Sequence, residues 1–159
     1  MPLLILWLIL IGLTRWGAMQ GEFAQYLPDW AYVPGVTPRH PEGWFSDLKD
    51  SFRTHTPLET FGDTLLFRVG LYYLDHGYFW ECHEVVEPLW LAAPARSAER
   101  IFFQLIIQVA NAGLKRKMGR MNAYSRLVGM AETLASDLRS RGVDAIYGIK
   151  LADIMYYTA

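Results

Sequence analysis

The sequence predicts an all-α protein, a compact bundle of four to five helices that follows an irregular N-terminal arm. From Leu58 onward the segments between glycine and proline stops have helical lengths, and their apolar residues recur at spacings of three and four. Before Leu58, prolines and glycines interrupt any long helix or central strand. With 159 residues, 52% of them apolar, the chain is long enough to bury one substantial core.

The arm covers residues 14 to 57 and combines chain-breaking residues with many aromatic ones. A free linker would not carry so many aromatic side chains, so we expect the arm to wrap around the helical body. The aromatic residues are Trp16, Phe23, Tyr26, Trp30, Tyr32, Trp44 and Phe45. We therefore expect one structural domain, with an apolar segment and wrapped arm over residues 1–57 and a helical bundle over residues 58–159.

Capping residues divide the bundle into its helices. Gly77 ends the first, because a glycine supplies the left-handed residue just past a helix C-terminus. Pro88 is expected to kink or locally open the second, since proline lacks an amide hydrogen and crowds the carbonyl of Glu84. Ser97 is suited to cap the third. The expected helices cover residues 58–74, 78 to about 94, 97–119, 120–141 and 144–157.

Charge and cysteine content exclude several classes of protein. Fifteen basic residues against 16 acidic ones leave no field to hold a nucleic acid backbone or an anionic membrane. Cys82 is the only cysteine, which rules out an internal disulfide and fits a reducing compartment, so we expect a cytoplasmic protein. The apolar run from Leu3 to Leu13 is shorter than the roughly 20 residues that a membrane-spanning helix needs. We expect no membrane span there.

The segment Gly77 to Trp90 contains the chemical centre of the sequence. His83 and Glu87 are four residues apart and share a helix face, at about 40° separation, so that one metal ion can touch both. This HExxE pattern resembles the metalloprotease HExxH with its second histidine replaced, and Glu84 takes the place of the general base. A third metal ligand is not evident.

The alternative is structural: His83 and Glu87 form a buried hydrogen-bonded pair, with Trp90 or Tyr78 donating to a carboxylate. Glu81 is expected to face solvent in the first helical turn, where the helix dipole favours negative charge. Cys82 is expected to be a small buried apolar residue rather than a nucleophile.

Two further groups of residues are candidates for ligand binding. A narrow polar stripe on the third helix, in otherwise apolar sequence, contains Gln108 and Asn111, which are placed to meet His83 or Glu87. The same stripe can instead be the exposed strip of a packed helix. Arg39 and His40 lie in the arm, where a folded-back conformation brings them to a bundle pocket and a simple turn leaves them in solvent.

The residues LYYLDHGYFWECHEVVEPLW, positions 71 to 90, resemble the domain of unknown function 309 family, a group of small helical proteins with HExxE followed by tryptophan. The resemblance extends over about residues 30 to 150. It implies an all-α bundle, an oligomer, and a site at the positions of His83, Glu84, Glu87 and Trp90. It implies no activity.

Two functional hypotheses follow. In the first, a polar pocket binds a small polar ligand or one divalent metal ion, with His83 and Glu87 as metal ligands. Hydrolysis is then the natural reaction, with Glu84 as the base and Gln108 or Asn111 orienting the substrate. In the second, the protein is a non-enzymatic, homo-oligomeric interaction module, and the same residues form an internal network.

Overall fold

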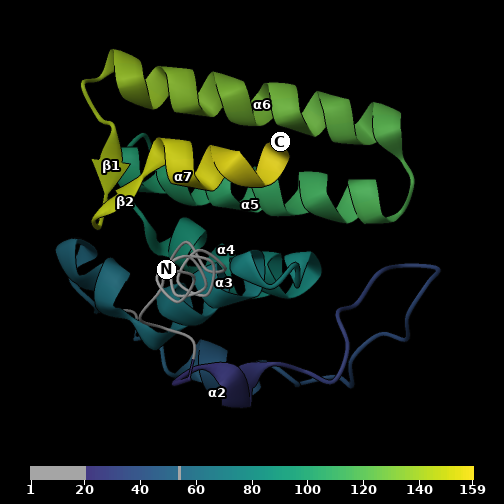
Figure 1. Ribbon diagram of the computed structural model, residues 1–159. Helices are drawn as coiled ribbons and strands as arrows, with labels where there is room; N and C mark the ends of the chain where they lie inside the picture. Colours follow the sequence, from purple (N-terminus) through teal and green to yellow (C-terminus); the bar gives the residue numbers. More distant parts are fainter. Residues whose placement is uncertain (1–20, 54) are drawn as a thin grey trace, which may run out of the picture.

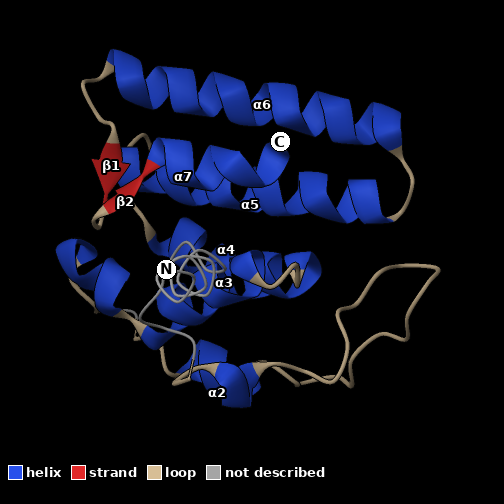
Figure 2. Ribbon diagram, in the orientation of Figure 1, coloured by secondary structure: helices blue, strands red, loops and turns tan. Residues whose placement is uncertain are grey.

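The computed structural model describes residues 21–53 and 55–159, and the prediction for Leu3 to Leu13 lies outside them. In Figure 1 the long helices lie in layers, with α6 (Met121–Ser140) on one side and α5 (Ala98–Lys117) beneath it. Next come α3 (Leu65–Asp75) and α4 (Phe79–Ala92), and the arm runs along the opposite side. Figure 2 shows that helices dominate the structure, which confirms the predicted all-α class.

Each long helix packs against the next along the chain: α3 on α4, α4 on α5, and α5 on α6. Two glycines allow these helices to approach closely. A Cβ atom at Gly70 of α3 would come within 2.7 Å of Val86, and one at Gly113 of α5 would come within 2.6 Å of the Phe79 ring. The core between these helices therefore depends on the absence of a side chain at two positions.

The described part of the arm contains two short helical pieces, η1 (Ala24–Tyr26) and α2 (Ser46–Asp50), joined by irregular chain. Phe23 and Phe45 are buried in the core, and the Tyr73 hydroxyl of α3 donates a hydrogen bond to the Tyr26 carbonyl. Arg68 lies over the Phe23 ring at 5.0 Å. Through these contacts the described part of the arm packs on the helical body.

The predicted helix ends are largely correct. Ser97 accepts a hydrogen bond from the Arg100 amide, and Gly77 has a φ of 74° just past α3. The first predicted helix is divided, because η2 (Leu58–Asp63) is a 3₁₀ helix and Thr64 caps a new helix at Leu65. Pro88 does not open α4, which continues as helix to Ala92.

The fifth predicted helix, residues 144–157, is wrong in its first half. Strands β1 (Ala145–Ile146) and β2 (Ile149–Lys150) form an antiparallel hairpin, and only then follow α7 (Leu151–Met155) and η3 (Tyr156–Thr158). The two residues of the turn, Tyr147 and Gly148, both have positive φ, as a type I′ turn requires. The Tyr147 hydroxyl also donates to the Leu58 carbonyl, which ties the hairpin to η2.

None of the helices in residues 21–53 and 55–159 is long and apolar enough to cross a membrane.

Candidate functional site

Helix α4 presents polar side chains toward two neighbours, the arm and α5. Glu81 is completely buried, whereas His83, Glu84 and Glu87 are half-buried. Glu81 and Glu84 meet the arm through His40 and Lys49 respectively, and His83 meets α5. Since successive residues turn by about 100° around a helix, this one segment contributes to two separate polar regions.

Glu81 holds the arm against the helical body. Its Oε1 atom accepts a hydrogen bond from the Tyr32 backbone N–H at 2.6 Å and lies 2.7 Å from His40 Nε2. Both partners belong to the arm, more than 40 positions earlier in the sequence. The second oxygen, Oε2, is buried and has no hydrogen-bond partner within the described residues. Such a carboxylate is costly to bury unless its contacts are strong, so these two bonds fix the position of the arm.

His40 lies in a cage of aromatic rings, with its side chain only 2% exposed. Trp30 and Trp44 stack on the imidazole, with ring centroids 5.6 and 5.7 Å away. Phe45 approaches edge-on at 6.0 Å, and Trp80 of α4 lies at the same centroid distance. The four rings and the Glu81 carboxylate together hold the imidazole in one orientation.

The negative charge of Glu81 also reaches the groups behind it. Burial raises the pKa of the Tyr73 hydroxyl, and the charge of Glu81 raises it further. The same two causes, in the same order, raise the pKa of Tyr78 and of the Cys82 thiol. Cys82 is therefore held as a neutral buried thiol, which agrees with its predicted structural role.

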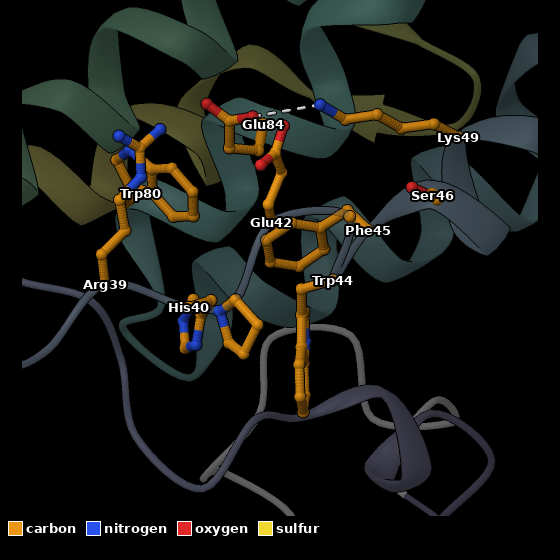
Figure 3. A pocket seen from close by; sticks show the side chains of 11 residues that line it. Arg39, His40, Glu42, Trp44, Phe45, Ser46, Lys49, Trp80 and Glu84 are labelled. Atoms are coloured by element: carbon orange, nitrogen blue, oxygen red, sulfur yellow. Dashed lines mark hydrogen bonds and ion pairs between the residues drawn. The ribbon is translucent and has the colours of Figure 1, made fainter.

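A pocket of about 520 Å³ lies where the arm meets α4 (Figure 3). It takes side chains from the arm, from α2 and from α4, so it exists only while the arm is docked. The residues that line it are Arg39, His40, Pro41, Glu42, Gly43, Trp44, Phe45, Ser46, Lys49, Trp80 and Glu84. We call it the arm pocket.

The charged groups of the arm pocket are only partly paired. Lys49 Nζ lies 3.0 Å from Glu84 Oε2, with the two side chains 35% and 27% exposed. The Arg39 guanidinium lies 5.7 Å from the centre of the Trp80 ring. In Figure 3 the carboxylate of Glu42 points toward Glu84. Within the described part of the chain neither Arg39 nor Glu42 has an ion-pair partner.

The other polar region lies between α4 and α5. His83 Nδ1 is 2.9 Å from Asn111 Oδ1, so the predicted meeting of these two residues is confirmed. Because the Asn111 side-chain oxygen can only accept a hydrogen bond, His83 donates to it from Nδ1. In the neutral form of His83 the free lone pair is then on Nε2. Arg100 lies over the Trp90 ring at 4.8 Å, at the other end of the same helix pair.

The remaining predicted residues of this region are less engaged. The side chains of Glu87 and Gln108 are half-buried and make no hydrogen bond to any other described residue, and His83 pairs with Asn111 rather than with Glu87. Trp90 Nε1 is buried without a partner among residues 21–53 and 55–159. Tyr78 donates to the Pro28 carbonyl, not to a carboxylate. The structural alternative, a buried His83–Glu87 pair with tyrosine or tryptophan donors, is therefore not what the side chains form.

Metal donors do not converge in the described residues. No group of three histidine, cysteine, aspartate or glutamate side chains is placed there to hold one ion. His83 and Glu87 remain two half-buried donors on one helix face, and Glu84 is paired with Lys49. A zinc site with three protein ligands is not present among these residues.

The expectation that Glu81 faces solvent is wrong. Glu81 precedes Val85 by four residues and Leu89 by eight, so it lies on the apolar face of α4, and this spacing is the signal that could have identified it. Lys49, Glu42 and the two pocket tryptophans were not predicted as site residues. Their role depends on how the arm folds back, which local sequence does not specify.

The fold and the site together define a small all-α protein in which an N-terminal arm closes a polar pocket against the second long helix. Residues 67–127 match the family model described as a domain of unknown function (DUF309), so the family resemblance predicted from the sequence is confirmed. The matched segment includes most of α3, all of α4 and α5, and the start of α6. It is shorter than the predicted range and leaves out the arm.

No curated protein and no solved structure matches the chain.

Proposed function

We propose that the protein binds a small polar ligand in the arm pocket. One observation carries this proposal: the completely buried Glu81 carboxylate accepts its two hydrogen bonds among the described residues from the arm, and the docked arm forms a pocket of about 520 Å³ lined with charged and aromatic groups. A volume of this size is in the range of known small-molecule sites. A buried charge is an unfavourable way to hold a loop unless the position of the loop matters.

The chemistry of the lining supports a polar ligand rather than an apolar one. Arg39, Glu42, Lys49 and Glu84 all border the cavity, and Ser46 contributes a hydroxyl group. Trp44, 50% exposed, offers an aromatic surface beside these charges. A few charged groups at fixed positions beside aromatic rings are typical of sites that orient a small polar molecule.

A ligand-observed NMR screen of small charged, zwitterionic and neutral compounds tests the proposal. The variant Ser46→Trp fills the pocket from α2 with a bulky ring, because Ser46 is an exposed lining residue. Ser125→Trp places the same ring at an exposed position of α6 and serves as the matched control. We expect compounds that bind the wild-type protein and the control but not Ser46→Trp. If every compound that binds also binds Ser46→Trp, the proposal is wrong.

The second candidate is a divalent metal ion bound through His83 and Glu87, with hydrolysis as its chemistry. The hydrogen bond from His83 to Asn111 favours it, because metal-binding histidines are commonly oriented by an acceptor at the other ring nitrogen. The lack of a third donor among the described residues opposes it. Glu84 as a base, and Gln108 or Asn111 as orienting groups, belong to this version of the site.

Elemental analysis of protein purified without an affinity tag tests the metal candidate, beside the variant His83→Ala. Binding of close to one equivalent of zinc, manganese or iron that disappears in the variant would support it. Less than about 0.1 equivalent in both proteins, with no gain after metal is added, would exclude it. The homo-oligomeric alternative predicts instead a mass above that of one chain in analytical ultracentrifugation, with neither metal nor small compounds bound.

A further inference from the structure

The arm pocket contains two positive and two negative side chains, and their pairing is unequal. Lys49 and Glu84 neutralise each other at 3.0 Å. Among residues 21–53 and 55–159, Arg39 lies over the Trp80 ring with no carboxylate at ion-pair distance, and Glu42 has no basic group at that distance. The pocket therefore presents one uncompensated guanidinium group and one uncompensated carboxylate.

These two groups do not occupy the same part of the pocket. In Figure 3 the guanidinium of Arg39 lies beside Trp80, with Glu84 between it and Lys49. The carboxylate of Glu42 points toward Glu84, so the region around these two acids carries more negative than positive charge. The charges of the pocket are thus separated into a positive end at Arg39 and a negative region at Glu42 and Glu84.

A ligand with a single kind of charge would match only one end of the pocket. A simple anion near Arg39 gains one partner but leaves Glu42 uncompensated, and a simple amine near Glu42 leaves Arg39 uncompensated. A molecule with an anionic group and an ammonium group satisfies both ends, and its connecting methylene groups can pack on the exposed ring of Trp44.

From this arrangement we infer that the arm pocket binds a zwitterionic small molecule, with its carboxylate on Arg39 and its ammonium group on Glu42 and Glu84. The inference rests on the proposed function and names its ligand class. His40 does not contribute a charge to the ligand, because its Nε2 atom is directed at Glu81 and its ring is enclosed by tryptophans.

A homologous series of ω-amino acids tests the inference and measures the separation of the two ends. The series is β-alanine, 4-aminobutyrate, 5-aminopentanoate and 6-aminohexanoate, and the singly charged controls are butyrate and butylamine. Binding to the full chain is followed by ligand-observed NMR at low ionic strength, since exposed charge contacts weaken with salt. We expect one chain length to bind at least about tenfold more tightly than either control.

Two neutralising variants assign the two ends. Arg39→Gln removes the positive end and Glu42→Gln the negative one, and both side chains are exposed, so neither change disturbs the core. Each variant is expected to bind the tightest ω-amino acid about tenfold more weakly than the wild-type protein does. Arg39→Gln should leave the affinity for butylamine unchanged, and Glu42→Gln should leave the affinity for butyrate unchanged. Arg139→Gln and Glu132→Gln, at exposed positions of α6, are the matched controls and should change no affinity.

The results that overturn this inference differ from those that overturn the proposed function. If butyrate or butylamine binds as tightly as every ω-amino acid, or if neither neutralising variant weakens binding, the ligand is not a zwitterion held by these two groups. The pocket still binds a polar ligand in that case, provided that Ser46→Trp abolishes binding of the singly charged compound. The proposed function is refuted only if every compound that binds the wild-type protein also binds Ser46→Trp.

Discussion

Substitution of Glu81 by alanine removes the carboxylate that holds the arm. The Tyr32 amide and the His40 ring, now 2.6 and 2.7 Å from Oε1, both lose their partner, and the His40 side chain is only 2% exposed. Leaving a buried hydrogen-bonding group without its partner typically costs about 1 to 3 kcal/mol, and the substitution leaves two such groups. The buried Oε2 atom has no partner in the described residues, and relief of its desolvation offsets part of that cost. We therefore expect a loss of about 3 kcal/mol in the free energy of unfolding.

The variant Glu84→Ala is the matched control. It removes the same side chain from the same helix three residues later, so the change in helix propensity is equal. Glu84 forms a partly exposed ion pair with Lys49, and such pairs contribute about 0 to 1 kcal/mol. Urea unfolding at neutral pH, followed by tryptophan fluorescence, gives both values. A difference below about 1 kcal/mol between the two variants would refute the role assigned to Glu81.

Three further results are expected. Gly113→Ala should destabilise the protein by about 1 to 3 kcal/mol in the same urea assay, because its Cβ atom would lie 2.6 Å from the Phe79 ring. The control Gly129→Ala, on α6 with no other atom within 4 Å of its Cβ position, should be neutral or stabilising. Equal effects of the two substitutions would contradict the packing of α4 on α5. Burial and the charge of Glu81 raise the pKa of Tyr73, so its hydroxyl is protonated in the folded and unfolded states below about pH 10, and above that pH the unfolded state ionises first. The free energy of unfolding should therefore fall as the pH rises above about 10. Phenolate absorbance from all nine tyrosines at a pH where the protein is still folded would contradict this. Cys82 should react with a thiol reagent only as fast as the protein opens, and rapid reaction of the native protein would show that it is not buried.

The helical body is predictable from sequence because its signals are local. Ser97 caps α5 and Gly77 follows α3 in the left-handed conformation, as the sequence predicts. The C-terminal hairpin is missed because its turn is formed by Tyr147 and Gly148, and a tyrosine at positive φ is not a usual turn residue. Contacts of Tyr147 with Leu58, distant in sequence, accompany that conformation.

The candidate site is predictable only in part, for a related reason. The periodicity of the third helix identifies Asn111 as a possible partner of His83 or Glu87 and leaves an exposed stripe as the alternative, and the structure has the contact with His83. The contact of Glu81 with His40 depends on an irregular arm that returns to α4 from 41 residues away, which periodicity cannot describe. The rule that acidic residues favour the first turn of a helix predicts solvent exposure for Glu81, and tertiary burial overrides it.

Tryptophan indole signals in the ¹H–¹⁵N NMR spectrum give the most direct test of where a ligand binds. Trp44 and Trp80 line the arm pocket, whereas Trp90 lies between α4 and α5 beside Arg100. During titration with the tightest-binding compound of the screen, the indole signals of Trp44 and Trp80 should shift together and that of Trp90 should stay in place. A shift confined to Trp90 would place binding between α4 and α5 and contradict the arm pocket as the functional site.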